Sequence, residues 1–190
     1  AQAPFSTEYI HSTLVGNPDI ASLPVKLFHA KMSPTEQADT TPILAQIDGE
    51  LSSVTSLDED RIVRWFLDLF NAMLRTNFYQ TDKDGSRKDR LSFKFKASDI
   101  PNLPKPKPMF EIYVYSPKVE GVHLRGGKVA RGGIRWSDRM EDYRTEVLGL
   151  VKAQMVKNSV IVPVGSKGGF VCKDKPKQAN REMWQAYGVV

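Results

Sequence analysis

The sequence predicts an α/β fold, in which a helical region over residues 1–80 is followed over residues 81–190 by an α/β domain with a mixed sheet. Three patterns support this prediction. Apolar residues recur at helical spacing before residue 80 and alternate with polar residues soon after it. Residues 159–164 form an almost continuous apolar run, which is typical of a strand buried on both faces.

The helical region contains two clear amphipathic segments. In the first, the apolar residues are Ile43, Ile47, Leu51 and Val54. The second begins at a capping box, in which Ser56 and Glu59 satisfy amide groups of the first turn, and we expect it to continue to Leu74. Its apolar residues cover a wide surface, which favours packing against several neighbouring helices over a cofactor site.

The sheet is predicted to begin with residues 91–96, where Leu, Phe and Phe alternate with Ser, Lys and Lys. The proline-rich loop 100–108 cannot continue a strand or a helix, because each proline lacks an amide donor. A second strand is expected at 110–115. After a turn at 116–121, a third strand is expected at 122–124.

The composition of the chain excludes several classes of protein. The 190 residues suffice for one or two domains. The single cysteine, Cys172, excludes an internal disulfide and gives no sign of an oxidising compartment, so we expect a cytoplasmic protein. The net charge is +5, but the basic residues of 83–90 alternate with acidic ones, so we expect no nucleic-acid partner. We expect no membrane partner, because no apolar run approaches the roughly 20 residues of a membrane helix. His11 and His29 lack partners at ligand spacing, so no metal site is expected.

Two glycine-rich segments carry the residues suited to chemistry. Gly132 and Gly133 follow Arg131, so a ligand could approach the backbone closely while the guanidinium binds a carboxylate through two hydrogen bonds. Lys167 lies in what reads as a glycine turn, 165–169, just beyond the expected apolar strand, where open α/β sheets bind their ligands. There a lysine could act as a base or polarise a carbonyl. A phosphate-binding loop is the second interpretation, but its glycine spacing is not present.

A helix is expected between these segments, capped by Ser137 or Asp138 and reaching Lys157 or Asn158. Gln154 and Lys157 are three residues apart, which places them side by side on one helix face, where both could bind a second carboxylate. Spacing alone favours a solvated helix end for this pair.

These segments resemble a known family. Residues 127–139 read GKVARGGIRWSDR, residues 145–150 read TEVLGL, residues 152–158 read KAQMVKN and residues 163–170 read PVGSKGGF. They resemble the large-subunit class of bacterial NAD-specific glutamate dehydrogenases, and the resemblance covers most of residues 50–172.

The resemblance implies roles for individual residues. Lys167 would be the catalytic lysine that promotes attack of water on the iminoglutarate intermediate. Gln154 and Lys157 would bind the substrate α-carboxylate. Arg131, followed by Gly132 and Gly133, stands where the smaller hexameric enzymes have a lysine that binds the distal carboxylate.

The resemblance also implies an activity: reversible oxidative deamination of L-glutamate to 2-oxoglutarate and ammonium with NAD, in a homo-oligomer. The chain has no Gly-x-Gly-x-x-Gly turn, so we expect NAD to bind outside it, together with the proton-transferring aspartate. On this interpretation residues 81–190 are the N-terminal part of the catalytic substrate-binding domain. The chain is then a fragment, inactive alone. A related amino-acid dehydrogenase of other substrate preference and a non-catalytic regulatory or oligomerisation module remain the alternatives.

Overall fold

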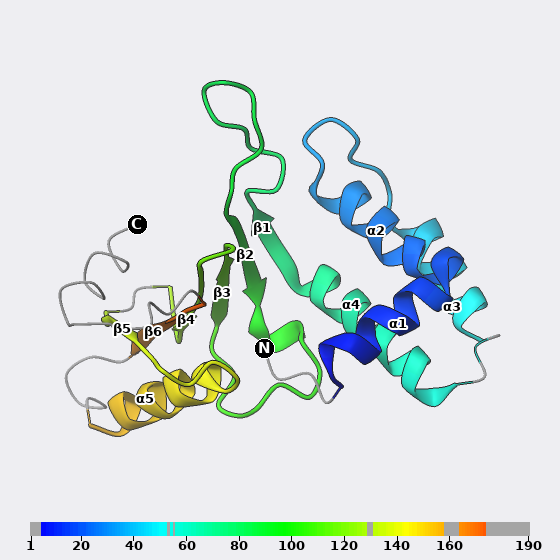
Figure 1. Cartoon of the computed structure of the whole chain (residues 1–190). Helices are drawn as coiled ribbons and strands as arrows, with labels where there is room; N and C mark the ends of the chain where they lie inside the picture. The colour runs from blue at the N-terminus through cyan, green and yellow to red at the C-terminus, as the bar shows by residue number, and fades with distance from the viewer. Residues whose placement is uncertain (1–4, 53, 55, 129–130, 158–163, 174–190) are drawn as a thin grey trace.

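The computed structural model describes residues 5–52, 54, 56–128, 131–157 and 164–173, and it confirms the α/β class (Figure 1). Four helices come first: α1 (Thr7–Gly16), α2 (Pro18–Met32), α3 (Thr41–Leu51) and α4 (Leu57–Ala72). The later elements are strands β1 (Met73–Thr76), β2 (Leu91–Lys96), β3 (Phe110–Tyr115), β4 (Val119–Arg125), β5 (Ile134–Trp136) and β6 (Ser166–Cys172), the short 3-10 helix η1 (Ala97–Asp99) and helix α5 (Tyr143–Lys157).

The helical region forms as the apolar periodicity predicts. The Ser56 hydroxyl accepts a hydrogen bond from the Glu59 amide at 3.4 Å, which confirms the serine half of the capping box. Helices α2, α3 and α4 pack around one buried cluster of apolar side chains. Its members are Leu23, Leu27, Ile47, Leu51, Val63 and Leu67.

The end of α4 was predicted wrongly. The helix ends at Ala72, and Met73 begins β1, whose Cα partner in β2 is Phe95. Met73 is only 2% exposed, and its side chain packs beside Phe95. The strand therefore buries this side chain as fully as a further helical turn would. Pairing with β2 thus overrides the local helical pattern. The division of the chain into domains at residue 80 remains a prediction.

The sheet has six strands in the described residues, in the order β1-β2-β3-β4-β6-β5. It is mixed, as predicted, because β5 and β6 are parallel while the other neighbours are antiparallel. Strands β2 and β3 have the expected bounds. Strand β4 begins at Val119, earlier than expected, since a tight turn in which the Ser116 amide donates to the Val119 carbonyl at 2.8 Å already reverses the chain.

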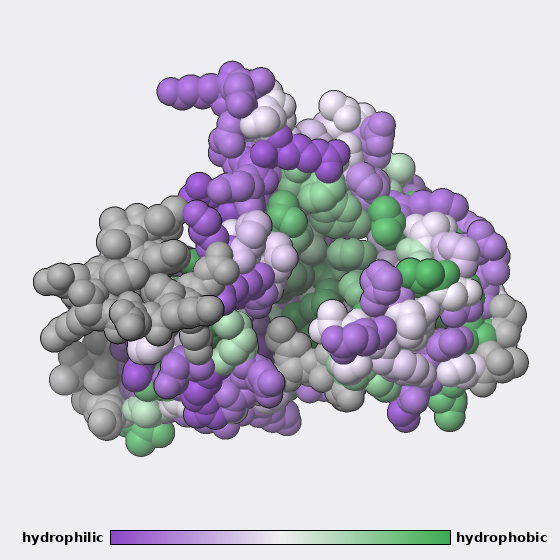
Figure 2. Space-filling model, in the orientation of Figure 1, coloured by the Kyte–Doolittle hydropathy of each residue, from purple (hydrophilic) through white to green (hydrophobic). Residues whose placement is uncertain are grey.

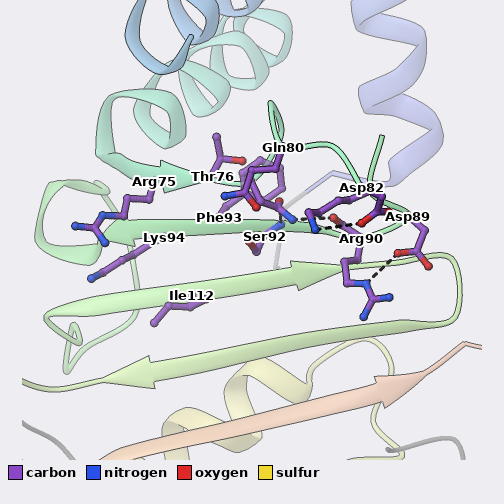
Figure 3. Close-up of a pocket in the computed structure, with 12 residues that line it drawn as sticks. Arg75, Thr76, Gln80, Asp82, Asp89, Arg90, Ser92, Phe93, Lys94 and Ile112 are labelled. Atoms are coloured by element: carbon purple, nitrogen blue, oxygen red, sulfur yellow. Dashed lines mark hydrogen bonds and ion pairs between the residues drawn. The ribbon is translucent and has the colours of Figure 1, made fainter. Parts of the chain in front are cut away.

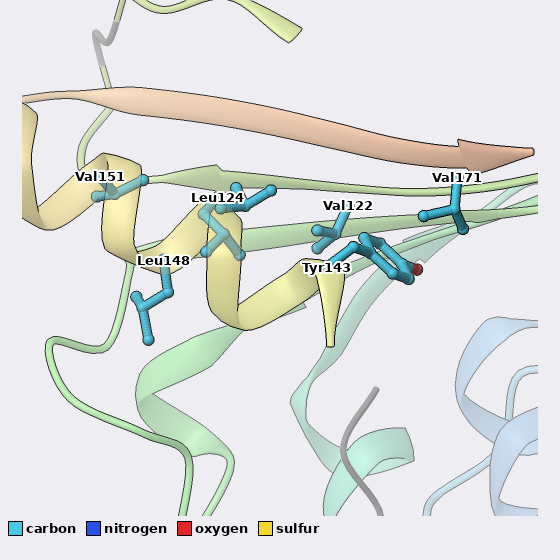
Figure 4. Close-up of a cluster of buried hydrophobic side chains, with 7 residues drawn as sticks. Val122, Leu124, Tyr143, Leu148, Val151 and Val171 are labelled. Atoms are coloured by element: carbon cyan, nitrogen blue, oxygen red, sulfur yellow. The ribbon is translucent and has the colours of Figure 1, made fainter. Parts of the chain in front are cut away.

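Helices α4 and α5 cover the same face of the sheet. The strand side chains that pack against the two helices lie at alternate positions along the strands, so they all point to one side. Figure 4 shows the cluster beneath α5, formed by Val122, Leu124, Tyr143, Val147, Leu148, Val151 and Val171. A second cluster joins the helical region to β1 and β2 and contains Phe28, Ala72, Met73, Phe95 and Ile100. Figure 2 shows hydrophobic surface in the hollow between the sheet and the helices.

A buried ion pair fixes α5 to the sheet. Arg144, in the first turn of α5, donates from Nε and Nη2 to the two carboxylate oxygens of Glu111 on β3, each at 2.7 Å. The side chains are 4% and 9% exposed. The pair also lines a cavity of about 380 Å³ beneath α4. Asp68 of α4 lines the same cavity, and burial raises the pKa of its carboxyl group. Such a pair fixes the position of α5 on β3, because a charge left without its partner in an apolar environment is strongly destabilising.

Replacing Arg144 by methionine should therefore leave the Glu111 carboxylate buried and unpaired. We expect a loss on the order of 3–5 kcal/mol in the free energy of unfolding. Replacing both residues by methionine should recover most of that loss, since no buried charge is then left alone.

The measurement is urea denaturation of the chain followed by circular dichroism. Arg61→Met is the control, because Arg61 pairs with Asp58 on the exposed surface of α4, and it should cost less than about 1 kcal/mol. A loss for Arg144→Met no larger than that of the control would contradict the anchoring role.

Candidate active site

Strand β6 is the centre of the candidate site, and it corrects one prediction. Lys167 lies inside β6, where its Cα partner on β4 is Leu124, and not in a glycine turn beyond a strand end. The apolar run at residues 159–164, expected as the preceding strand, lies outside the described residues except for Val164.

The glycines after Lys167 serve close packing rather than a turn. A Cβ atom on Gly169 would lie 2.4 Å from Cγ2 of Val147 on α5. One on Gly168 would lie 2.8 Å from Cγ1 of Ile134 on β5. Glycine therefore lets α5 approach one face of β6 while β5 pairs with its edge, and a side chain at either position would push these elements apart.

Strand alternation fixes the direction of the Lys167 side chain. A Cβ on Gly165 would point at the Gln154 side chain and one on Gly169 at Val147, so both positions face α5. Lys167 lies two residues from each of them, and side chains two residues apart in a strand point to the same face, so the Lys167 side chain points to the α5 side of the sheet. Its side chain is partly buried, and within the described residues it forms no ion pair, which leaves its ammonium group available to a ligand.

The segment from Arg131 to Gly133 lies directly against β6. The Ser166 amide donates to the Arg131 carbonyl at 3.2 Å, and the Gly168 amide donates to the Gly133 carbonyl at 3.0 Å. A Cβ on Gly132 would lie 1.4 Å from the Ser166 carbonyl oxygen, so only glycine fits there. The residues that follow form β5.

Gln154 joins α5 to this segment. Its Nε2 donates to the Arg131 carbonyl at 3.1 Å, while its Oε1 is buried without a hydrogen-bond partner in the described part of the chain. A buried acceptor without a partner is uncommon in folded proteins and is often explained by a ligand or water. The Arg131 side chain is exposed. The structure thus brings Arg131, Gln154 and Lys167 together at one end of β6.

Two predictions about α5 have different outcomes. The helix reaches Lys157 as expected, although the side chain of Lys157 lies outside the described atoms. It begins at Tyr143, however, and not directly after Ser137 or Asp138. The Ser137 hydroxyl instead accepts from the Arg139 amide and donates to Glu146 at 2.5 Å, which closes a turn before the helix.

Sequence reasoning missed two residues near the site. Glu146 on α5 binds Ser137 and also lies 3.6 Å from the Arg135 guanidinium, so it ties β5 to the helix. His123 on β4 is the Cα partner of Gly168, and burial together with Arg125 lowers the pKa of its imidazole. The contacts of α5 with β5 reveal the position of Glu146, and the strand register reveals that of His123, so the tertiary structure was needed for both.

Comparison with known proteins now decides the family. Residues 46–190 match the family described as bacterial NAD-glutamate dehydrogenase, catalytic domain, and residues 1–34 match glutamate dehydrogenase, helical motif 3. The chain belongs to the bacterial NAD-glutamate dehydrogenase family.

Curated relatives agree with this family. The NAD-specific glutamate dehydrogenase of Halomonas elongata is 52% identical over 187 residues, and that of Pseudomonas aeruginosa is 55% identical over 192 residues; each match covers 97% of this chain. That of Mycobacterium tuberculosis is 48% identical over 197 residues and 98% of the chain. The chain spans 12% of the length of each of these relatives.

Among the described residues, no helix is both long enough and apolar enough to cross a membrane. No cluster of three or more His, Cys, Asp or Glu side chains within the described ranges has the arrangement of a metal site.

The packing of α5 on β6 gives a test of the site. We expect Gly169→Ala to destabilise the chain by on the order of 1–3 kcal/mol, because Val147 is buried and cannot move away from the added methyl group. Gly149→Ala on α5 is the control, since a Cβ there meets nothing within 4 Å. It should stabilise the helix by about 0.5–1 kcal/mol. Urea denaturation measures both, and equal stability of the two variants would rule out this packing.

Proposed function

We propose that this chain supplies the substrate-binding part of an enzyme that deaminates L-glutamate oxidatively and reversibly to 2-oxoglutarate and ammonium. The observation that carries the proposal is the convergence of Arg131, Gln154 and Lys167 at one end of β6. The names of the relatives support glutamate over other amino acids.

Each residue has a part in this proposal that its surroundings support. The Arg131 side chain is exposed while its backbone is held, so its guanidinium binds the distal carboxylate of the substrate through two hydrogen bonds. Gly132 and Gly133 keep the backbone beside it free of side chains. Gln154 retains one N–H donor after bonding the Arg131 carbonyl, and this donor binds the α-carboxylate together with Lys157.

Lys167 performs the chemistry in this proposal. In its neutral form it accepts a proton from the water that attacks iminoglutarate, and in its protonated form it donates a hydrogen bond that polarises the carbonyl of 2-oxoglutarate in the reverse direction. The rigid strand supports this role, since a base must lie within hydrogen-bond reach of the proton it removes.

NAD, which the family name implies, does not fit the described residues. Among the described residues, β5, α5 and β6 form a βαβ unit, the arrangement that binds a dinucleotide in a Rossmann fold. The turn from Ser137 to Asp142, however, has no glycine, and its serine hydroxyl is already bonded to Glu146. We therefore place NAD outside this chain, as NAD supplies the oxidant in the family reaction. We also propose a cytoplasmic homo-oligomer as the working form; a sequence with a single cysteine, the buried Cys172, is compatible with a reducing compartment.

Replacing Lys167 by alanine in the full-length protein should lower kcat by at least about 100-fold, the lower range for loss of a general acid or base. The folded state should persist, because Lys167 makes no ion pair among the described residues. Steady-state reduction of NAD with glutamate is the measurement, and Lys152→Ala, an exposed lysine on α5, is the control. Near-normal activity of the Lys167 variant would disprove the assignment.

Arg131 should determine the preference for a dicarboxylate. We expect Arg131→Leu to raise KM for glutamate by about 10- to 100-fold, since a hydrogen bond to a charged group contributes about 1.5–3 kcal/mol. Activity with leucine should change far less. Comparing kcat/KM for the two amino acids tests this, and a wild-type preference for leucine would remove Arg131 from its role.

A further inference from the structure

A pair of cations lies on the two strands at the β1 edge of the sheet, away from Lys167 on β6. Arg75 of β1 and Lys94 of β2 are direct cross-strand partners. Like charges directly opposite one another destabilise a sheet. Within the described residues, neither side chain has an acidic partner; Lys94 instead lies over the Phe110 ring, with Nζ 4.2 Å from its centroid. The fold therefore holds two uncompensated cations together.

A β-bulge creates this pairing. Met73 is opposite Phe95, whereas Arg75, two residues later, is opposite Lys94, only one residue away on β2. With regular pairing, Leu74 would have faced Lys94, and Arg75 would have faced Phe93 on the helix-covered side of the sheet. The bulge instead brings Arg75 to Lys94 and leaves Leu74 44% exposed. Bulges of this kind redirect side chains and are frequent beside functional sites.

The two cations border a cavity of about 720 Å³, shown in Figure 3, where their side chains extend in the same direction from neighbouring strands. The other charged residues of the cavity neutralise one another. Lys88 pairs with Asp82 at 3.2 Å, and Arg90 pairs with Asp89 at 2.9 Å. Neutral hydrogen-bonding side chains, Thr76, Gln80 and Ser92, line the same cavity. Its uncompensated charge is therefore positive and is located at Arg75 and Lys94.

We propose that this cavity binds a phosphate-type dianion between Arg75 and Lys94. A dianion matches the two cations, the planar guanidinium presents paired donors to its oxygens, and the ammonium contributes a point charge. The volume exceeds that of free phosphate, so the same chemistry also suits a phosphate group carried by a larger molecule. The site is separated from Lys167 by β3 and β4 and does not depend on the reaction proposed for Lys167.

The test is isothermal titration of the chain with orthophosphate, pyrophosphate and a nucleoside monophosphate, with ionic strength held constant by sodium chloride. We expect binding by the wild type, weakened at least tenfold by Arg75→Gln and by Lys94→Gln. If the nucleotide binds more tightly than orthophosphate, the rest of the cavity contacts the molecule that carries the phosphate group. If the two bind equally, the ligand is the free ion. Either result supports the site.

Lys96→Gln is the matched control, because Lys96 lies on the same strand and the same face as Lys94 but pairs with Asp99 at 3.0 Å. It should change affinity less than twofold. Circular dichroism confirms that each variant is folded, and the anion should raise the Tm of the wild type but not that of Arg75→Gln. No binding of any probe at about 10 mM, or equal weakening by all three substitutions, would overturn the proposal.

Discussion

The close approach of three chain segments to β6 is the constraint on which the candidate site depends. Gly132 meets the Ser166 carbonyl, Gly168 meets Ile134, and Gly169 meets Val147, each at a separation that leaves no room for a side chain. These contacts set the positions of the Arg131 backbone, strand β5 and helix α5 around one strand. Lys167 lies within that strand, so the packing that shapes the sheet also orients the lysine.

Helix α5 connects this arrangement to the rest of the fold. Its first turn is fixed to β3 by the buried pair of Arg144 and Glu111, and its last turns bring Gln154 to the Arg131 carbonyl. The apolar contacts between these points are non-directional, whereas the ion pair and the amide hydrogen bond each require one geometry. They therefore fix the rotation and position of the helix on the sheet. The position of Gln154, which we propose binds substrate, therefore depends on Glu111, more than thirty residues away in sequence.

Several elements followed from local patterns. The alternation of Leu91, Phe93 and Phe95 correctly predicted β2, and Ser56 correctly marked the start of α4, because both signals are carried by neighbouring residues. The end of α4 was not predictable in this way. Met73 fits the helical period equally well, and only its pairing with Phe95 selects a strand. The bulge that follows is invisible in the sequence for the same reason, since it is defined by the register between two strands.

The sequence by itself determined the fold class and the family, because motif spacing and residue type are local properties of the chain, and it supplied the residues of the proposed site. It did not determine what the glycines do. Gly168 and Gly169 read as a turn, since glycine favours turns when nothing else is known. Tertiary structure decided that they are strand residues, because the limit on their size comes from Ile134 and Val147, which other elements bring into contact. Likewise, only the register places Arg75 opposite Lys94 and aims Lys167 at α5, because side-chain direction in a sheet depends on pairing and not on composition.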